Sequence, residues 1–377
     1  MTQAGRAGTY IQQSGNYRAF IPRPLPPAPP LVYDDELLGL LSLADQAVGR
    51  LDAASELLPN PDLFVAMYVN KEAVLSSQIE GTQASLNDVL EVQAGVVRKE
   101  RAGDVGEVVN YVKAMNHGLA RLDSLPLSLR LIREIHADLL KNVRGSRRDP
   151  GEFRRTKNWI GPSGTSLSQA LFVPPPQHEV PKAMGDLENY LHLPAPPPPL
   201  LVKAGLAHAQ FETIHPFLDG NGRLGRLLIT FLLCQWGLLK KPLLYLSLYL
   251  KKHRQEYYER LQSVRDLGDW EGWLKFFLRG VAEVAGQASA TASAIQRLRN
   301  EHLKLMDAIP QGMRLLELMF KMTFITVTLA GNSLGVSYPT ARKVIQKFVA
   351  LGLLQEITSG QRNRVYSYAS YLALFQD

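Results

Sequence analysis

The chain has 377 residues, 46% hydrophobic and 20% charged, which is the composition of a folded globular protein large enough for two or three domains. Its net charge of +7 favours anionic partners such as nucleotides or nucleic acid, although charge alone does not determine a fold. The single cysteine excludes an internal disulfide framework, and neither a secretory signal nor a membrane-spanning run is visible, so we expect a cytoplasmic protein with no membrane contact.

Residues 1–110 are expected to form a proline-rich leader followed by helices. Proline is dense in residues 22–30, which excludes a helix and favours an extended segment. From Tyr33 to about Leu122, apolar residues recur at helical spacing. One helix of this region is expected over about 67–81, where Gly81 would end it.

Residues 111–287 are expected to form a helical core. Helices are predicted at 128–144, 200–214, 221–239, 250–267 and 273–287. Leu171–Val173 precedes three prolines, and this pattern predicts a short strand that forms half of a hairpin.

Residues 288–377 are expected to form a linker helix, over 286–300, and a C-terminal domain. Helices are predicted at 312–322 and 326–332, and a third begins after Ser337, which can cap it. Strands are predicted at 353–358 and 364–368, joined at 359–361. Three helices followed by a β-hairpin is the order of a winged-helix domain, so the predicted fold class is mainly α with a C-terminal α+β module.

The segment His215–Arg226 combines an imidazole, a carboxylate, three glycines and two guanidinium groups directly before an apolar helix. Gly220, Gly222 and Gly225 match the G-x-G-x-x-G dinucleotide pattern, but no strand precedes them and no acid follows at the required distance. The more general mechanism remains: glycines before a helix let backbone N–H groups converge on an anion, and the helix dipole adds positive charge.

The charged residues of this segment indicate a bound polyphosphate. Arg223 and Arg226 oppose the helix dipole, which favours acids at a helix N-terminus, so their placement indicates an external anion. Asp219 can hold Mg²⁺ together with phosphate oxygens, and His215 can accept a proton from a hydroxyl. Each residue alone has an ordinary structural explanation, but no packing argument requires all of them in this order.

Residues 215–226 resemble the signature of the Fic family, His-x-Phe-x-(Asp/Glu)-Gly-Asn-Gly-Arg-x-x-Arg, and match it at every fixed position. Pro150–Arg154 and Leu167–Pro176 resemble the family's segment before the flap and the flap hairpin itself. The resemblance covers roughly 130–280 and implies a Fic-type helical bundle with a short β-hairpin flap, with 111–287 as the catalytic core.

The resemblance implies transfer of AMP from ATP to a Ser, Thr or Tyr hydroxyl of a protein, which can be the chain itself. His215 would be the general base, and Asp219 would hold Mg²⁺ on the phosphates. The implied nucleotide-binding residues are Gly220, Asn221, Gly222, Arg223 and Arg226.

Residues 76–81 match the family's inhibitory pattern, (Ser/Thr)-x-x-x-Glu-(Gly/Asn). Ser76 and Glu80 are four residues apart and share one helix face. Glu80 lies in the last turn of the predicted helix, where the dipole disfavours a negative charge, so it should bind a cation. We expect that cation to be Arg226. The Glu80–Arg226 pair would then occupy the γ-phosphate position and hold ATP in an unproductive pose.

The C-terminal module is basic: residues 311–377 contain seven Lys or Arg and three Asp or Glu. Arg342, Lys343 and Lys347 lie on the predicted recognition helix, and Arg362 and Arg364 lie on the predicted wing, which suits DNA phosphates. Winged-helix domains also serve in protein docking and dimerisation, so the sequence leaves open whether the partner is DNA or a second copy in a homodimer.

Three alternatives to a restrained transferase remain. The same site could remove AMP from a modified protein if Glu80 activates water. The core could sense ATP for a DNA-binding regulator, although the intact His215 argues against this because a sensor needs no base. Transfer of another phosphate-containing group, such as UMP or phosphocholine, is also compatible with the motif.

Overall fold

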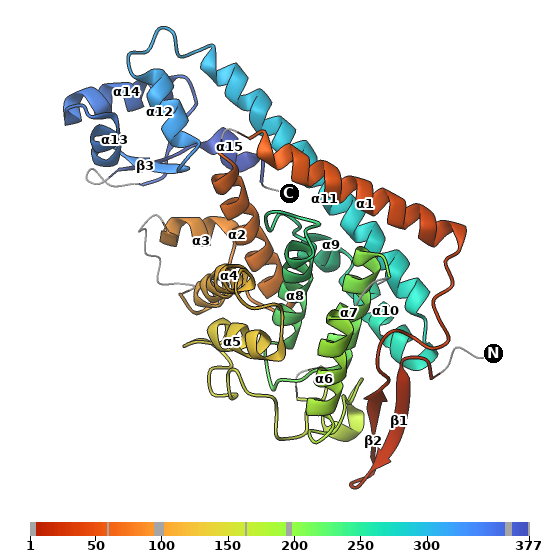
Figure 1. The fold of residues 1–377 in the computed structure, drawn as a ribbon. Helices are drawn as coiled ribbons and strands as arrows, with labels where there is room; N and C mark the ends of the chain where they lie inside the picture. The colour runs from red at the N-terminus through yellow and green to blue at the C-terminus, as the bar shows by residue number, and fades with distance from the viewer. Residues whose placement is uncertain are drawn as a thin grey trace. The chain divides into compact units, whose positions relative to one another are not determined.

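The computed structural model describes residues 5–58, 60–93, 102–162, 164–193, 198–358 and 364–375. The chain divides into two compact units, of which unit 1 comprises residues 1–49 and 69–285 and unit 2 comprises residues 50–68 and 286–377. The described residues are mainly helical, which confirms the mainly α part of the predicted fold class (Figure 1). Among the described residues, no helix is long and apolar enough to cross a lipid bilayer.

Unit 1 contains a β-hairpin followed by helices (Figure 1). The strands are β1 (Gly8–Gln13) and β2 (Tyr17–Pro22). The helices within it are α3 (Leu86–Gln93), α4 (Ala102–Leu122), α5 (Leu129–Leu139), α6 (Val180–Leu191), α7 (Leu200–Ile214), α8 (Asn221–Gln235), α9 (Ser247–Lys252) and α10 (Arg254–Leu267). Three helices contribute residues to both units: α1 (Asp35–Glu56), α2 (Pro61–Ile79) and α11 (Trp270–Leu303).

The centre of unit 1 is the pair α7 and α8. The two helices pack against each other, while α4 and α5 pack against α8 and α6 and α10 pack against α7 (Figure 1). Every residue of α7 from Leu201 to Ile214 is buried, because the helix is covered on all sides. The polar residues that α7 carries therefore lie inside the unit, and Glu212 and Thr213 are the ones nearest in sequence to the segment that links α7 to α8.

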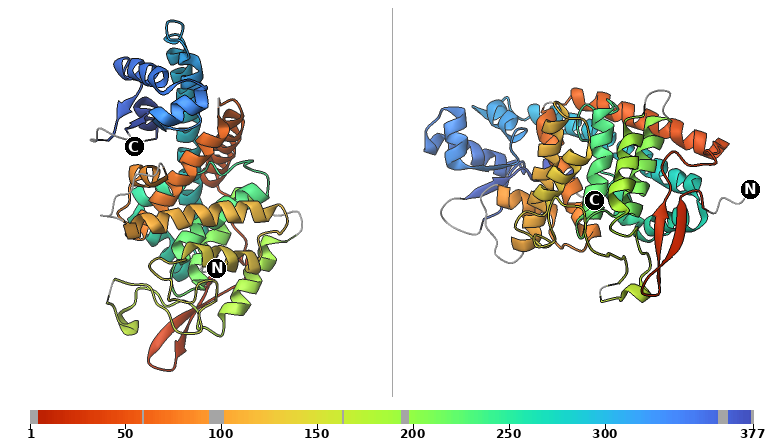
Figure 2. Two further views of the ribbon diagram at one scale, coloured as in Figure 1. Left: turned by 90° about the vertical axis from the view of Figure 1, so that its left-hand side faces the viewer. Right: turned by 60° about the horizontal axis from the view of Figure 1, so that its bottom comes forward.

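The first thirty residues contain an antiparallel hairpin that the sequence did not predict. β1 pairs with β2 so that Gly8 lies opposite Pro22. The Phe20 N–H donates to the Val173 carbonyl at 2.9 Å, and the Phe20 ring packs against Phe172, so the hairpin lies beside the segment between α5 and α6 (Figure 2). The stretch after β2 is not helical, as its prolines required.

Several predicted helix boundaries are wrong, and the helices expected over 128–144 and 221–239 end earlier, at Leu139 and Gln235. The helix expected over about 67–81 begins at Pro61 and ends at Ile79, so Glu80 follows the last helical residue instead of lying in the last turn. The helix expected over 250–267 is two helices, because His253 leaves helical geometry with ψ at 38°. The helices expected over 273–287 and 286–300 are one helix, α11, because no proline interrupts this stretch.

The segment predicted as a strand and flap hairpin forms a single β-bridge instead. Ile160 and Phe172 pair as an isolated antiparallel bridge, in which the Ile160 N–H donates to the Phe172 carbonyl at 2.8 Å. A one-turn helix, Leu167–Gln169, lies between them. Residues 174–176 are prolines and have no N–H to donate, so the pairing does not extend into strands.

Unit 2 combines helices with a small antiparallel sheet (Figure 1). Its elements are α12 (Gly312–Met319), β3 (Phe324–Thr326), α13 (Val327–Leu334), α14 (Tyr338–Ala350), β4 (Gln355–Glu356), β5 (Val365–Ser367) and α15 (Ala369–Ala373). β5 lies between β3 and β4. The sequence predicted strands where β4 and β5 lie but missed β3 and α15, and the joining turn predicted at 359–361 lies outside the described residues.

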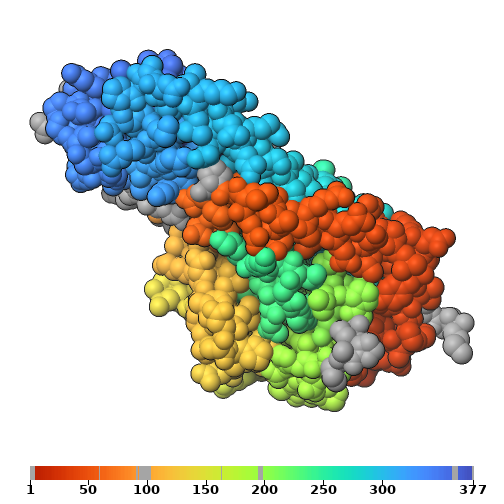
Figure 3. Space-filling view, turned by 45° about the horizontal axis from the view of Figure 1, so that its top comes forward, coloured from red at the N-terminus to blue at the C-terminus, as the bar shows by residue number. Residues whose placement is uncertain are grey.

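The close packing of α4 on α8 gives a first prediction. A Cβ on Gly118 would lie 2.4 Å from the Phe231 ring, so Gly118→Ala should lower the free energy of unfolding by about 1–3 kcal/mol through overpacking. On α1, which lies at the surface (Figure 3), a Cβ on Gly39 would meet nothing within 4 Å. Gly39→Ala should therefore stabilise by about 0.5–1 kcal/mol. Urea unfolding measures the change in unfolding free energy for both variants. Equal changes in the two variants would contradict the close packing of α4 on α8 at Gly118.

Candidate active site

A cavity of about 830 Å³ opens beside the His215–Arg226 segment in unit 1. This volume lies within the range of about 300–1,000 Å³ that is usual for small-molecule sites. Its walls come from the end of α7, the start of α8, α10 and the residues around the Ile160–Phe172 bridge. The sequence-predicted residues that line it are Glu80, His215, Asp219, Gly220, Asn221, Gly222, Arg223 and Arg226.

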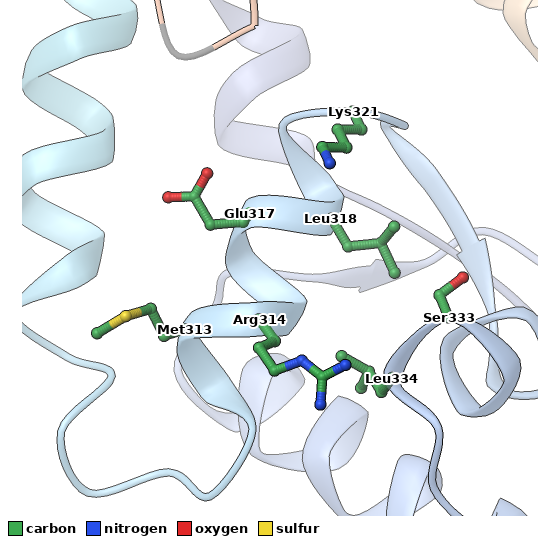
Figure 4. Close-up of a pocket in the computed structure, with 7 residues that line it drawn as sticks. All are labelled: Met313, Arg314, Glu317, Leu318, Lys321, Ser333 and Leu334. Carbon is green, nitrogen blue, oxygen red and sulfur yellow. The ribbon is translucent and has the colours of Figure 1, made fainter.

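Unit 2 contains a smaller cavity of about 360 Å³ (Figure 4). It is lined from α12, the turn after it and α13, by Met313, Arg314, Glu317, Leu318, Lys321, Ser333 and Leu334. This lining contains no histidine or cysteine that could accept a proton or act as a nucleophile near pH 7. We therefore place the candidate active site in unit 1.

The chain turns sharply at His215, the residue that ends α7. Its φ of 49° lies in the left-handed region, which is uncommon outside glycine and costs on the order of 1–3 kcal/mol. Arg154 holds this turn: its Nε donates to the His215 carbonyl at 2.9 Å, and its main-chain N–H donates to the Pro216 carbonyl at 2.9 Å. The turn places the imidazole at the wall of the cavity.

Asn221 shapes the loop between His215 and α8 through its side chain. Its Oδ1 accepts from the Phe217 N–H at 2.9 Å, and its Nδ2 donates to the Phe217 carbonyl at 2.8 Å. The Phe217 ring is fully buried and stacks on His136 with 3.7 Å between the ring centroids. The Asn221 side chain and the buried Phe217 ring therefore fix the conformation of this loop. This role is separate from any contact of the Asn221 main chain with a ligand.

His136 of α5 holds the turn that carries Asp219. The Gly151 N–H donates to its Nδ1 at 2.8 Å, so the proton lies on Nε2, which donates to the Asp219 carbonyl at 2.9 Å. Burial lowers the pKa of His136 to about 4 and keeps the ring neutral. This role of His136 could not be predicted from the sequence, because the residue lies 83 positions before Asp219 and belongs to no local motif.

Asp219 fits a role as a magnesium ligand. Its Oδ1 accepts from the Gly220 N–H at 2.6 Å, whereas its Oδ2 faces Gly145, where a Cβ would lie only 2.8 Å away. Among the described residues, no group of three or more His, Cys, Asp or Glu could hold a metal ion. A metal at Asp219 would therefore need phosphate oxygens, and Mg²⁺ is usually bound by one or two carboxylates together with such oxygens.

Arg223 is buried and paired with an acid that the sequence analysis missed. Its Nη1 donates to Glu107 of α4 at 3.1 Å, and Glu107 also pairs with Arg144 at 3.3 Å. Burial raises the pKa of Glu107, and the two arginines oppose that shift. Arg223 Nη2 lies 3.8 Å from Asp219, and Arg223 Nε is buried without a hydrogen-bond partner among the described residues. This arginine retains a donor for a ligand.

Arg226 binds the end of α2. Its Nε donates to the Ser76 hydroxyl at 2.8 Å, and its Nη2 donates to the Ser76 carbonyl at 3.0 Å and to Glu80 Oε1 at 2.6 Å. Burial would raise the pKa of the Glu80 carboxyl, but the Arg226 charge outweighs this and holds that pKa below its usual value. The sequence predicted Glu80 as the partner of Arg226, but it predicted neither of the bonds from Arg226 to Ser76.

The Glu80 carboxylate lies against the N-terminus of α8. A Cβ on Gly222 would lie 2.1 Å from Glu80 Oε1, so a side chain at this position would displace the carboxylate. The first turn of α8 has unsatisfied N–H groups and the positive end of the helix dipole. Glu80 therefore occupies the position where these groups would bind an external anion.

His208 ties α7 to the first turn of α8. Its Nδ1 lies 2.9 Å from the Gly225 carbonyl, which can only accept, so the proton lies on Nδ1. Its Nε2 lies 2.9 Å from the Tyr257 hydroxyl and accepts from it. Burial lowers the pKa of His208 to about 4.

This lowered pKa predicts how stability depends on pH. The unfolded chain binds a proton at this histidine below about pH 6.5, whereas the folded chain binds it only near pH 4, so stability is lost as the pH falls through this window. The expected loss is about 3 kcal/mol. The His208→Gln variant has no titrating group at this position, so its stability should lack this loss. The difference in unfolding free energy between parent and variant should therefore shrink from pH 7 to pH 4. A constant difference would contradict the assignment.

The comparisons with known proteins identify the family. Residues 38–120 match the Fic/DOC family N-terminal model, and residues 126–233 match the Fic/DOC family model. The protein adenylyltransferase Fic of Drosophila grimshawi is 32% identical over 213 residues, which are 54% of this chain and 39% of that protein. Its namesake in Aedes aegypti is 32% identical over 214 residues, which are 54% of this chain and 38% of that protein.

The match therefore spans about two fifths of the length of these relatives. The solved structure of a Fic family protein from Desulfovibrio desulfuricans G20 has the same fold, with a TM-score of 0.61 and 21% identity, and the likeness covers 90% of this chain and 97% of that one. On these grounds the chain belongs to the Fic/DOC family, with the family's N-terminal region preceding its Fic domain.

Proposed function

We propose that this chain transfers AMP from ATP to a hydroxyl group of a protein and that Glu80 restrains the reaction. The observation that carries this proposal is that one cavity is lined by His215, Asp219 and Arg226 where α8 begins. Similarity over about half of the chain to proteins named protein adenylyltransferase Fic supports the same activity.

In this proposal, His215 is the general base. Burial, together with the charges of Arg154 and Arg265, lowers the pKa of His215 to about 3, so its imidazole is neutral near pH 7 and can accept a proton. His215 takes the hydroxyl proton, the oxygen bonds to the α-phosphorus, and the bond from that phosphorus to the leaving pyrophosphate breaks. The remaining residues contribute positioning and charge neutralisation, as is usual for phosphoryl and nucleotidyl transfer.

The phosphates would bind at the start of α8. The main-chain N–H groups at Gly220, Asn221 and Gly222 would hold the diphosphate, with the unpartnered Arg223 Nε as a further donor. Arg226 would bind the γ-phosphate. Asp219 would hold Mg²⁺, which when bound neutralises charge on the phosphates.

Glu80 would restrain this reaction by competition. Its carboxylate and the γ-phosphate would use the same partner, Arg226, at the same helix N-terminus. While Glu80 holds Arg226, ATP lacks the contact that aligns its phosphates. Ser76 supports the restrained arrangement because it binds Arg226 through both its hydroxyl and its carbonyl.

The reverse reaction is a second candidate function. The Glu80 carboxylate lines the same cavity as His215, so it could take a proton from a water molecule that attacks an AMP-modified side chain. Release of free AMP from a modified protein by the parent, and its loss in the Glu80→Gly variant, would indicate this activity.

The restraint predicts the effect of removing Glu80. Incubation with α-labelled ATP and Mg²⁺ should give at least about tenfold more label on protein for Glu80→Gly than for the parent, since relief of 1.4 kcal/mol of competition already gives a factor of ten. Adding His215→Ala to Glu80→Gly should reduce labelling by about 10²-fold or more. The control, Asp123→Gly, removes an exposed carboxylate from the turn after α4 and should label like the parent. Equal labelling of Glu80→Gly and parent would refute the restraint.

We further propose that α14 of unit 2 contacts duplex DNA. Its buried face carries Ala341, Val344, Ile345 and Phe348, and its opposite face exposes Arg342, Lys343 and Lys347. None of these three cations forms an ion pair with another described residue, whereas Arg364 pairs with Glu356. The order of helices and strands, with β5 between β3 and β4, supports a winged-helix arrangement in which such a helix enters the major groove. Arg362 lies outside the described residues.

DNA contact by these cations predicts a salt dependence. Retention of the chain on duplex DNA should fall with salt, and replacing Arg342, Lys343 and Lys347 by serine should lower the slope of log K against log salt by about 2 to 3. The control replaces three exposed cations of unit 1, Lys141, Arg147 and Arg148, with the same change in net charge. Equal slopes for the two variants, or retention that is indifferent to salt, would favour protein docking or dimerisation instead.

A further inference from the structure

Glu212 of α7 is a buried acid in the active-site cavity that lies outside the family signature. It precedes His215 by three residues, its side chain is 8% exposed, and it lines the cavity. Its Oε1 is buried and has no hydrogen-bond partner in the described structure. A buried carboxylate oxygen without a partner is costly, so its position in the cavity requires an explanation.

The other oxygen of this carboxylate, Oε2, faces an unpartnered imidazole nitrogen. Glu212 Oε2 lies 4.0 Å from His215 Nδ1, and Nδ1 is also buried without a hydrogen-bond partner among the described residues. A carboxylate accepts and a neutral imidazole donates from one of its nitrogens, so the two groups are complementary. A separation of this size is common in unliganded sites, where catalytic hydrogen bonds shorten when the substrate binds.

We propose that Glu212 is a positioning residue for His215 and that its carboxylate accepts the Nδ1 proton in the substrate complex. This inference rests on the proposed function above. With the proton held on Nδ1, the lone pair lies on Nε2, which accepts the hydroxyl proton of the target. The ring then becomes an imidazolium, and the Glu212 carboxylate stabilises its charge without taking a proton itself.

The charged groups around Glu212 link this role to Glu80. Burial raises the pKa of Glu212 to about 7, the Arg226 and Arg265 charges lower it, and the Glu80 charge raises it. Departure of Glu80 from Arg226 would therefore favour the ionised form of Glu212. Tyr257 of α10 is also close to Glu212: burial raises the pKa of the Tyr257 hydroxyl, and the Glu212 charge raises it further.

Gly225 supports the position of the carboxylate independently. A Cβ at Gly225 would lie 2.3 Å from Glu212 Oε1, and the φ of Gly225 is not in the left-handed region. Glycine is required here for the close approach of Glu212 and not for backbone conformation. The carboxylate therefore fits against α8 at Gly225, which lies in the sequence between Arg223 and Arg226, the two arginines proposed to bind phosphate.

One competing acceptor exists for His215 Nδ1. The main-chain carbonyl of Glu212 lies close enough to the ring to raise the pKa of His215 against the effect of burial. Arg265 Nη2 already donates to that carbonyl at 3.2 Å, which leaves it less basic. Side-chain substitutions at Glu212 keep the carbonyl, so they separate the two acceptors.

Kinetics in the Glu80→Gly background provide the first test. Glu212→Gln keeps an acceptor but removes the charge, and Glu212→Leu removes both. We expect Glu212→Leu to lower kcat by about 10²-fold or more while the KM for ATP changes less than about threefold. The acid limb of the pH profile should move to lower pH in both variants, because the imidazolium loses its counter-charge. Asp186→Asn, on the exposed face of α6, is the control. Unchanged kcat, or a change in KM alone, would overturn the proposal.

Nuclear magnetic resonance of ¹⁵N-histidine-labelled protein provides a readout that does not need turnover. With an ATP analogue that has a methylene group between its α- and β-phosphates, His215 should carry its proton on Nδ1 in Glu80→Gly and also after Glu212→Gln is added. Adding Glu212→Leu should shift the proton towards Nε2. An unchanged tautomer in that variant would assign the role to the carbonyl and overturn the proposal, whereas absence of AMP transfer by Glu80→Gly itself would refute the proposed function.

Stability gives a check on the carboxylate's position that is independent of both readouts. Gly225→Ala should lower the Tm of the parent, because the new Cβ meets the Glu212 carboxylate. The same substitution should lower Tm less in the Glu212→Ala background, where that contact is absent. Equal losses of Tm in both backgrounds would place the carboxylate elsewhere and overturn the inference.

Discussion

The bond between Arg226 and the end of α2 is the interaction on which the site depends. A buried guanidinium needs an anion, and here Glu80 supplies it at 2.6 Å while Ser76 binds the same group twice. Removing a partner from such a pair leaves an uncompensated buried charge, so the position should be filled either by Glu80 or by a ligand of the same charge. In the proposed function that ligand is the γ-phosphate of ATP, and restraint and catalysis then compete for a single cation.

The geometry of the site comes from residues that bind its main chain. Arg154 holds the left-handed turn at His215, Asn221 holds Phe217, and His136 holds the carbonyl of Asp219. These bonds fix the loop between α7 and α8, and the fully buried α7 provides the support behind it. In the proposed function, these bonds keep a neutral base and a phosphate site at one wall of the cavity without a contribution from the substrate, which is the preorganisation that nucleotidyl transfer requires.

The sequence predicted what is local and missed what is distant. The order of charges in 215–226 contradicts the preference of a helix N-terminus, and this local conflict was sufficient to indicate an anion site. The four-residue spacing of Ser76 and Glu80 likewise predicted that these two side chains share one helix face. Glu107 and His136 reach the site from α4 and α5. The helical spacing of apolar residues does not indicate such long-range contacts. The β1–β2 hairpin and the bridge at Ile160 depend on packing against residues far along the chain, and α11 continues past residue 287 because no proline interrupts it.

The relative affinity for ATP and ADP tests the central claim most directly, because the two nucleotides differ only in the γ-phosphate that would bind Arg226. Calorimetric titration of the His215→Ala chain, with and without Glu80→Gly, measures both affinities without turnover. If Glu80 occupies the γ-phosphate position, the chain with Glu80 should bind ATP and ADP almost equally, and the Glu80→Gly chain should bind ATP at least about tenfold more tightly than ADP. An ATP preference of the same size in both chains would contradict the account.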